Sequence, residues 1–334
     1  MPEESKSIWK PLVDSYGRRH DYLRVSLTDR CNFRCQYCMP SDGIEWQDKA
    51  EILSFEEIEK LVRIFVRLGV RKVRLTGGEP TVRKGIVELV QSLGQIEGIE
   101  RLLMTTNGTS LKKIVIPLKQ AGLNGINISL DSLQRDRFQR ITRRDAFDNV
   151  MVGIEASVVA GISTKINVVV MPGMNDDELI DFVEFVRNRP IQVRFIEFMP
   201  FGGNLWKPER VMGYADMKEI LTRKFVLNRL PGEISDVAKE FWIEGFQGTV
   251  GFVTSVTDSF CEGCNRIRMS ADGRLKTCLF LPNQTSLRDM VRSNASDEDI
   301  ANAIRADLST KWAGHPPMNN WKQLDQLSMV QIGG

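Results

Sequence analysis

Short apolar segments alternate with amphipathic ones six times in succession, and this alternation constrains the fold more than any other feature of the sequence. The segments that we expect to be strands are residues 22–27, 72–75, 102–105, 125–130, 164–170 and 193–198. Those between them have helical spacing, as in residues 83–94 and 176–187, and residues 54–57 (Ser-Phe-Glu-Glu) form a capping box. Strands that alternate with helices pair in parallel beneath a helical layer. Because six units are fewer than the eight of a closed barrel, we predict an α/β fold, an incomplete (β/α)6 TIM-like barrel.

The pattern changes towards the C-terminus, where short strands replace the alternation. We expect strands at residues 241–244 and 249–253, and a helix at residues 297–311. We also expect a hairpin of 266–270 and 275–279, with a turn at Gly273 and Cys278 in its second strand. The sequence therefore predicts three parts, which are an N-terminal extension (1–20), the partial barrel (21–230) and a smaller C-terminal α+β region (231–334).

The six cysteines fall into two groups of three. The first group stands in the run Cys-Asn-Phe-Arg-Cys-Gln-Tyr-Cys, and the groups are Cys31, Cys35 and Cys38, then Cys261, Cys264 and Cys278. A closed zinc site needs four ligands, whereas three thiolates suit a cubane iron–sulfur cluster that keeps one iron open for a small molecule. The second group taken alone also fits zinc with a fourth ligand from elsewhere.

Composition argues against several classes of protein. Lysine and arginine (45) nearly balance aspartate and glutamate (43), so we expect no nucleic acid and no membrane surface as a partner. The first ten residues have no apolar core of a signal peptide, and no apolar run approaches the roughly 18 residues of a membrane span. We therefore expect a cytoplasmic protein whose thiols stay reduced.

Polar residues follow the predicted strands, at the edge where barrel enzymes carry their active sites. The first cysteine group follows the first strand, residues 76–80 (Thr-Gly-Gly-Glu-Pro) follow the second, and residues 105–108 (Thr-Thr-Asn-Gly) follow the third. Paired glycines let a ligand approach the backbone, and Glu79 supplies a carboxylate. Each feature also has a simpler interpretation, since Gly-Gly is often only a turn, and Arg18 and Arg19 are expected to be a solvated pair.

Taken together, these motifs resemble a known family. The Cys-x3-Cys-x2-Cys run with Tyr37 before its last cysteine, followed by Gly-Gly-Glu-Pro, resembles the radical S-adenosylmethionine (radical SAM) superfamily. Within it, the chain from residue 22 onward resembles the GTP 3′,8-cyclase family of molybdenum cofactor biosynthesis. The segments that carry this resemblance are 23–31, 74–80, 104–108, 127–131, 260–268 and the terminal Gly333-Gly334.

The resemblance implies a lyase that converts GTP to (8S)-3′,8-cyclo-7,8-dihydroguanosine 5′-triphosphate, the first step of molybdopterin formation. A 5′-deoxyadenosyl radical takes hydrogen from C3′ of the ribose, and the carbon radical then attacks C8 of guanine. The implied cofactors are S-adenosylmethionine and two 4Fe-4S clusters, one on each cysteine group. The implied partners are GTP, an electron donor such as a flavodoxin or ferredoxin, a downstream cyclic pyranopterin monophosphate synthase and, as an open alternative to a monomer, a second copy of the chain.

The same resemblance assigns site residues. Its S-adenosylmethionine positions are Tyr37, Gly78, Ser129 and Met199. Its GTP positions are Arg24, Arg74, Thr105, Lys165, Arg266 and Arg268, with Lys72, Asn167 and Arg194 as weaker candidates. It implies catalytic roles for Arg266, Arg268, Gly333 and Gly334.

Residue chemistry agrees with a bound triphosphate, because arginine forms bidentate hydrogen bonds with phosphate oxygens. Arg266 and Arg268 are alternate residues of a predicted strand, so both are expected on the same face. No Gly-x4-Gly-Lys-Ser/Thr loop is present, so we do not expect a GTPase of that type. Two other functions stay open, a radical SAM peptide-modifying maturase with an auxiliary cluster and a zinc-stabilised nucleic-acid-binding protein. Residues 171–175 carry a proline where this family is expected to have a more polar residue, and we assign that loop no role.

Overall fold

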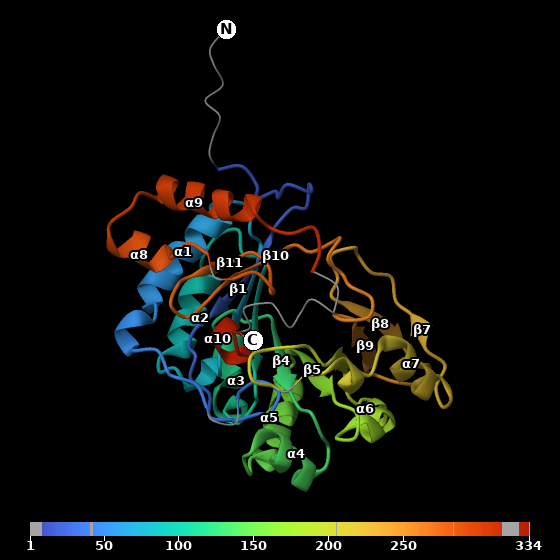
Figure 1. The fold of residues 1–334 in the computed structure, drawn as a ribbon. Coiled ribbons are helices and arrows are strands. Elements are labelled where there is room, and N and C mark those ends of the chain that lie inside the picture. Colours follow the sequence, from blue (N-terminus) through green and yellow to red (C-terminus); the bar gives the residue numbers. More distant parts are fainter. Residues whose placement is uncertain (1–8, 41–42, 205, 283, 316–326, 334) are drawn as a thin grey trace.

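The computed structural model describes residues 9–40, 43–204, 206–282, 284–315 and 327–333 (Figure 1). Its centre is one eleven-stranded sheet in the order β11-β10-β1-β2-β3-β4-β5-β6-β9-β8-β7. Neighbouring strands from β1 to β6 are parallel, as sequence alternation predicted. The strands are β1 (Tyr22–Ser26), β2 (Lys72–Thr76), β3 (Arg101–Thr106), β4 (Gly125–Ser129), β5 (Ser163–Val170), β6 (Ile191–Glu197), β7 (Asn228–Arg229), β8 (Ala238–Trp242), β9 (Thr249–Val253), β10 (Arg266–Met269) and β11 (Leu275–Lys276).

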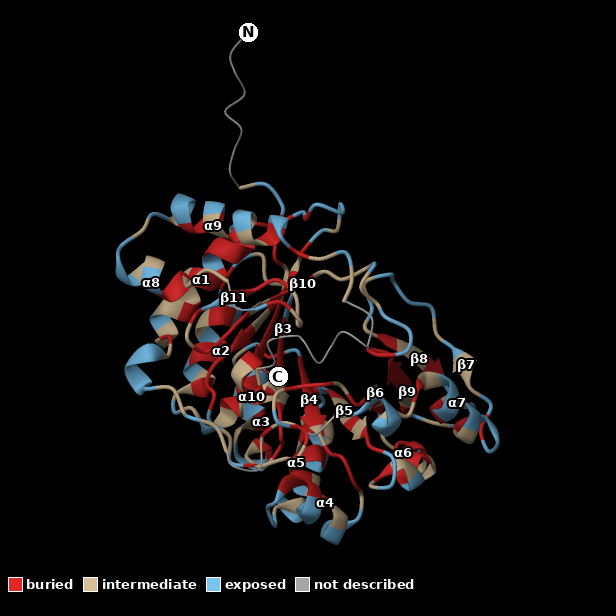
Figure 2. Cartoon of the chain, viewed as in Figure 1, coloured by how far each residue is buried: buried red, intermediate tan, exposed pale blue. Residues whose placement is uncertain are grey.

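Helices lie outside the strands, with their outer faces exposed and the strands largely buried (Figure 2). They are α1 (Phe55–Arg67), α2 (Ile86–Gly94), α3 (Leu111–Gln120), α4 (Arg135–Thr142), α5 (Phe147–Val159), α6 (Leu179–Phe185), α7 (Tyr214–Thr222), α8 (Leu287–Arg292), α9 (Asp297–Ser309) and α10 (Met329–Ile332). Short 3₁₀ helices occur at Lys49–Glu51, Pro80–Val82, Asp176–Glu178 and Pro208–Arg210. In the described residues, no helix is long and apolar enough to cross a membrane.

Helix α1 shows how local sequence determines these elements. The Ser54 hydroxyl accepts a hydrogen bond from the Glu57 amide at 3.1 Å, and the Glu57 carboxylate accepts one from the Ser54 amide at 2.7 Å. This is the predicted capping box, which satisfies amides that the first helical turn leaves without partners. Ile58 and Leu61 face inward and are fully buried, so the apolar face of the helix covers the sheet.

Several boundaries differ from the predictions for physical reasons. The helix expected to begin at residue 83 begins at Ile86, because Gly85 has φ of +85° and interrupts the helical backbone. The helix expected at residues 176–187 divides into a 3₁₀ turn and the shorter α6. The placement of Cys278 within a strand is wrong, since β11 ends at Lys276 and Cys278 lies two residues beyond it.

The C-terminal strands extend the same sheet at both edges. Strand β10 pairs in parallel with β1, and β9 pairs in parallel with β6. The register sets Arg266 opposite Tyr22 and Arg268 opposite Arg24. Residues more than 240 positions apart therefore lie side by side at the edge of the parallel strands.

Candidate functional site

One cavity of about 980 Å³ gathers almost every predicted site residue. Its lining includes Arg24, Cys31, Cys35, Tyr37, Cys38, Lys72, Arg74, Gly78, Thr105, Ser129, Lys165, Asn167, Arg194, Met199, Cys261, Cys264, Arg266, Arg268 and Cys278. Gly333 lies nearby but does not line the cavity, and Gly334 is outside the described residues. The structure thus brings both cysteine groups and the predicted cations to one chamber.

The first cysteine group lies in a compact loop after β1. The Cys35 carbonyl accepts hydrogen bonds from the amides of Cys38 and Met39, both at 3.1 Å. Burial raises the pKa of Cys31 to about 11 and raises the pKa values of Cys35 and Cys38 well above the usual value for a thiol. Thiolates in this setting need a compensating positive charge, which the iron of a cluster would provide.

The Gly-Gly-Glu-Pro motif packs directly against the chain that leads into this loop. A side-chain carbon at Gly78 would lie 2.4 Å from the Arg30 carbonyl oxygen, and the Gly78 amide donates to the Thr28 carbonyl at 2.6 Å. The glycines therefore allow two segments of this chain to approach each other, in addition to lining the cavity.

The Glu79 carboxylate lines the cavity and is already held by other groups of this chain. It is buried and accepts hydrogen bonds from the Thr106 hydroxyl and the Asn107 amide, both at 2.6 Å, and from Thr81. Glu79 therefore also has a positioning role, in which it fixes the turn after β3, and its availability to a ligand stays a prediction. This role could not be read from the motif alone.

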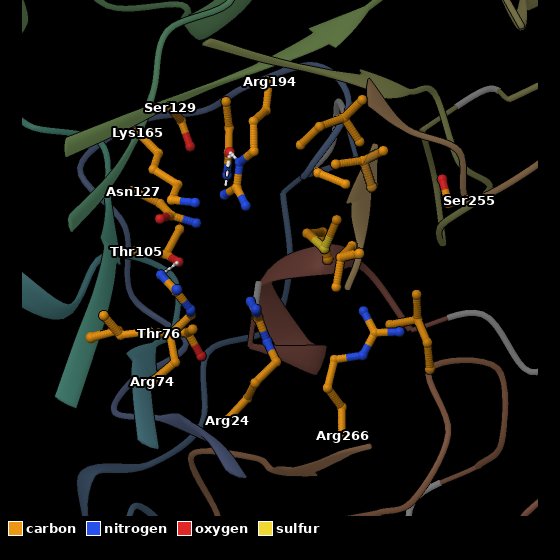
Figure 3. A pocket seen from close by; sticks show the side chains of 18 of the residues that line it. Arg24, Arg74, Thr76, Thr105, Asn127, Ser129, Lys165, Arg194, Ser255 and Arg266 are labelled. Atoms are coloured by element: carbon orange, nitrogen blue, oxygen red, sulfur yellow. Dashed lines mark hydrogen bonds between the residues drawn. The ribbon is translucent and has the colours of Figure 1, made fainter. Parts of the chain in front are cut away.

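Two of the predicted S-adenosylmethionine positions are joined through a residue that the sequence did not single out. The Asn204 side-chain amide donates to the carbonyl of Met199 at 2.9 Å and to the carbonyl of Tyr37 at 3.3 Å. Asn204 is buried, so these bonds connect the segment after β6 to the first cysteine loop. Ser129 lies at the end of β4 on the same side of the cavity as Lys165 and Arg194 (Figure 3).

Cationic side chains approach the middle of the cavity from two sides. In Figure 3, Arg24, Arg74 and Arg266 extend from one side, and Lys165 and Arg194 extend from the other. Two of these cations donate hydrogen bonds to neutral groups. Arg74 donates to the Thr105 hydroxyl at 3.4 Å, and Arg194 donates to the Asn167 side-chain oxygen at 2.8 Å. Lys165 also approaches Glu240 at 3.4 Å.

The pKa values record how crowded these charges are. Burial and the neighbouring Arg74 lower the pKa of Arg194 to about 10, and burial together with Arg24 and Arg266 lowers the pKa of Arg268 to about 9. The pKa of Lys165 is also lowered, first by burial and then by Arg194. A bound polyanion would offset the cost of burying these positive charges and would reduce the repulsion between them. The chamber is therefore suited to a ligand with several negative charges.

Tyr22 is a cavity residue that sequence reasoning missed. Its hydroxyl accepts a hydrogen bond from Arg74 Nε at 2.5 Å, and the Lys72 ammonium lies 4.4 Å from the centre of its ring. Burial raises the pKa of this phenol, but Arg74, Arg24 and Lys72 outweigh it and bring the pKa to about 7. The alternation Tyr22-x-Arg24 on a strand was the available signal, because it puts both side chains on one face.

Replacing Tyr22 with phenylalanine should weaken binding of a nucleoside triphosphate, the ligand that the resemblance implies, about tenfold, because the lost hydrogen bond no longer holds the Arg74 guanidinium. The ring and its contact with Lys72 remain in this variant. Equilibrium dialysis with GTP measures the effect without the reaction. A variant with Tyr16→Phe, at an exposed tyrosine outside the cavity, is the control, and equal affinities in the two variants would exclude this role.

Two cationic side chains, the buried Lys311 and the partly buried Arg18, contact the second cysteine group. Lys311 Nζ lies 3.4 Å from Cys264 Sγ and donates to the Arg266 carbonyl at 3.0 Å. Arg18 donates to the Cys261 carbonyl at 2.8 Å and to the carbonyls of Trp312 and Ala313. The prediction that the Arg18 side chain is solvated is therefore wrong.

The charge around Cys264 differs from that around the first group. Burial raises the pKa of the Cys264 thiol, but Arg266 and Lys311 outweigh burial and bring the pKa to about 6. This cysteine therefore sits in a positive environment that favours its thiolate, which is the form that binds metal.

The donor sets can be tested against the metal groups that they suggest. In the part of the chain that the structure describes, no three Cys, His, Asp or Glu side chains converge closely enough to hold a single metal ion. A cubane cluster makes a different demand, since each thiolate binds a different iron and the sulfurs surround a volume. All six thiols are free of disulfides. Each group therefore offers three free thiols, which is the number of protein ligands that a cubane cluster with one open iron takes.

The C-terminal segment meets the cavity beside β1. Met329 and Val330 of α10 line the chamber, and Gly333 ends the helix with φ of +90°. A side-chain carbon at Gly333 would lie 2.4 Å from Ser26 Cβ, so only glycine allows this approach.

Comparisons with known proteins agree with this geometry. Residues 25–186 match the family described as Radical SAM superfamily, and residues 191–317 match the family described as Molybdenum Cofactor Synthesis C. SuiB of Streptococcus suis, solved with bound S-adenosylmethionine, is similar with a TM-score of 0.59 and 16% identity over 87% of this chain and 69% of that chain. At this identity, the likeness concerns the fold alone.

Two relatives are much closer in sequence. The mitochondrial GTP 3′,8-cyclase of Arabidopsis thaliana is 47% identical over 325 residues, which cover 97% of this chain and 83% of the relative. Molybdenum cofactor biosynthesis protein 1 of Drosophila melanogaster is 49% identical over 307 residues, which cover 91% of this chain and 54% of the relative. This chain thus spans about half the length of the fly protein. The cavity, both family matches and these identities show that the chain belongs to the radical SAM superfamily and, within it, to the GTP 3′,8-cyclase family of molybdenum cofactor biosynthesis.

Proposed function

We propose that this protein is a radical SAM lyase that cyclises GTP to (8S)-3′,8-cyclo-7,8-dihydroguanosine 5′-triphosphate, the first step of molybdenum cofactor biosynthesis. The observation that carries the proposal is a single chamber that is lined by both cysteine groups and by a cluster of arginines and lysines. In this proposal, strands β1–β6 act as the incomplete barrel that supports the chamber.

The first cysteine group would hold one 4Fe-4S cluster, and the neighbouring positions Tyr37, Gly78, Ser129 and Met199 would hold S-adenosylmethionine. When bound, this cluster supplies the electron that cleaves S-adenosylmethionine. The chain's own contribution is to fix the loop, since Asn204 connects the backbone of Tyr37 to the segment after β6.

The second cysteine group would hold another 4Fe-4S cluster whose open iron takes the guanine. The cations on β1, β2, β5, β6 and β10 would pair with the triphosphate. Fixing a nucleotide at its base and at its phosphates would restrict the ribose that lies between them. Holding the reacting carbons in this way favours ring closure over loss of the radical.

The remaining partners are also part of this proposal. They are a flavodoxin-like or ferredoxin-like electron donor, a downstream cyclic pyranopterin monophosphate synthase and a second copy of the chain. The cytoplasmic location stays a prediction. A peptide-modifying maturase is the alternative, and the crowded cations favour a polyphosphate over a peptide.

The direct test is anaerobic incubation of the iron-loaded enzyme with S-adenosylmethionine, dithionite and GTP. We expect about eight irons per chain, and formation of cyclised GTP together with 5′-deoxyadenosine. ATP in place of GTP is the control. Formation of 5′-deoxyadenosine without any cyclised nucleotide would reject this function in favour of another radical SAM reaction.

Replacing Lys311 with methionine should lower the reduction potential of the second cluster. A buried ammonium beside Cys264 stabilises the additional electron of the reduced state, and methionine keeps the volume without the charge. Redox titration followed by electron paramagnetic resonance measures the potential. Lys112→Met, at an exposed position of α3, is the control, and an unchanged potential with full iron content would contradict this role.

A further inference from the structure

A hairpin that precedes the sheet packs against the part of the chain that carries the second cysteine group. We define the N-terminal hairpin as residues 11–20, in which Val13 and Arg19 form an antiparallel bridge. The Ser15 hydroxyl donates to the Ser309 carbonyl at 2.8 Å, so the hairpin lies beside the end of α9 (Figure 1). Neither family match covers this hairpin, since the first begins within β1 and the second begins at β6. The family matches therefore assign it no role.

Asp14 and Arg18 form an ion pair at the centre of the N-terminal hairpin. Arg18 Nε donates to Asp14 Oδ2 at 2.6 Å, and the Asp14 side chain is fully buried while that of Arg18 is 9% exposed. Asp14 Oδ1 accepts from the amides of Tyr16 and Arg18 at 2.9 and 3.0 Å. The buried His20 ring lies 3.0 Å from Asp14 Oδ2. The carboxylate thus fixes the direction of the Arg18 guanidinium and neutralises its charge.

The two terminal nitrogens of Arg18 bind three backbone carbonyls. Nη1 donates to the carbonyls of Cys261 at 2.8 Å and Ala313 at 2.6 Å, and Nη2 donates to that of Trp312 at 2.6 Å. The Cys261 carbonyl also accepts from the Cys264 amide at 3.1 Å, so it closes the turn between these two cysteines. One planar group therefore connects the cysteine turn to the segment after α9.

The segment after α9 makes a second contact with the same site. Lys311 is 3% exposed, and its Nζ donates to the Arg266 carbonyl at 3.0 Å and lies 3.4 Å from Cys264 Sγ. Arg18 holds the two residues that follow Lys311. Loss of Arg18 would therefore release the cysteine turn and loosen the segment that places Lys311 against Arg266.

We propose that Asp14 and Arg18 are positioning residues for the second cysteine group. Asp14 fixes the guanidinium of Arg18, and Arg18 holds the turn of Cys261 and Cys264 so that a cluster bound there presents its open iron to guanine. The proposal rests on the proposed function, which puts guanine at this group. Neither Asp14 nor Arg18 is among the described residues that line the chamber, so both act through the cysteine turn and not on the substrates.

The contacts distinguish a role in position from a role in charge. Arg18 is paired with Asp14 and reaches the cysteine turn through a carbonyl, whereas Lys311 is the cation beside the Cys264 sulfur. A lysine in place of Arg18 would keep the charge, but a single ammonium cannot reproduce the fork that pairs with a carboxylate and donates to carbonyls of two segments. A hairpin that only stabilised the whole fold would affect both cysteine groups alike.

The test uses the iron-loaded full chain with Arg18→Met and Arg18→Lys. We expect both variants to keep full iron content and to form 5′-deoxyadenosine with dithionite in the absence of GTP, because the first cysteine group is intact. In equilibrium dialysis, GTP should bind at least about tenfold more weakly to both. The change that GTP causes in the electron paramagnetic resonance spectrum of the second cluster should be lost at the GTP concentration that saturates the wild type. Arg19→Met, at the exposed neighbouring arginine of the same hairpin, is the control and should bind GTP as the wild type does.

Two results would overturn the proposal. One is wild-type affinity for GTP in Arg18→Met, and the other is recovery of that affinity in Arg18→Lys, which would assign the effect to charge. If Arg18→Met does not fold, Asp14→Asn takes its place, since asparagine keeps an oxygen for the backbone amides but lacks the charge that holds Arg18. Wild-type affinity in Asp14→Asn would equally overturn the proposal. Failure of the proposed function is read separately, from a wild-type chain that binds no GTP and forms no cyclised nucleotide.

Discussion

Replacing Cys35 with alanine is expected to abolish formation of both 5′-deoxyadenosine and cyclised GTP. Cys35 is the middle cysteine of the first group, and its side chain is partly buried. Its backbone carbonyl, which accepts from the amides of Cys38 and Met39, remains in the variant, so the loop should keep its path. Loss of one of only three thiolates should remove the cluster, and the iron content should fall by about half.

The matched variant is Cys278→Ala, which removes one thiolate from the second group. We expect the same loss of iron, but 5′-deoxyadenosine should still form because the first group is intact. Cyclised GTP should not form, since the base would lose its anchor. Iron analysis and product analysis of the two variants together separate the roles of the groups. Identical product patterns in the two variants would contradict the division of roles.

Replacing Gly333 with alanine is the second change with a large expected effect. The new methyl group would lie 2.4 Å from Ser26 Cβ and 2.8 Å from Ser26 Oγ, and the residue would also have to keep φ of +90°. The left-handed backbone alone costs alanine about 1–2 kcal/mol, and the contact with β1 adds to it. We therefore expect the tail to leave its position beside β1 and the rate of GTP cyclisation to fall by at least about tenfold.

A control for backbone strain is available in the same chain. Gly245 has φ of +77°, and a side-chain carbon there would meet nothing within 4 Å. Gly245→Ala should therefore reproduce the strain without the collision and retain cyclisation. Iron content should remain full in both variants, because neither glycine contacts a cysteine. If Gly333→Ala and Gly245→Ala cyclise GTP equally well, the contact with Ser26 has no part in the reaction.

Local patterns allowed the parallel strands to be predicted. Periodicity identified strands β1–β6, and the capping box at Ser54 marked the start of α1, because these signals depend on neighbouring residues. Predicted helix boundaries were wrong where backbone conformation determined them. The positive φ of Gly85, for example, makes α2 begin at Ile86. Cys278 was assigned to a strand because alternation continues past Lys276, whereas pairing between the strands ends there.

The residues of the candidate site also fall into those that the sequence predicted and those that it did not. Predicted residues that carry distinctive chemistry, such as the cysteines and the strand arginines, all line one cavity. Asn204 and Lys311 were missed because nothing in their own sequence neighbourhood marks them, and they contact Tyr37 and Cys264, which lie 167 and 47 positions away. Tyr22 was missed although it alternates with Arg24 on a strand, because its contact with Arg74 lies 52 positions away. Arg18 was taken for a solvated residue because its carbonyl partners belong to the second cysteine loop and to the segment after α9.

The sequence by itself determined the chemical inventory, which consists of two groups of three thiols, many arginines at strand positions and a glycine-rich motif after the second strand. The tertiary structure alone decided that β10 pairs with β1 and so sets Arg266 and Arg268 beside Tyr22 and Arg24. The physical reason is that spacing along the chain records local backbone preferences. Contacts between distant segments depend on how the whole sheet is paired and packed.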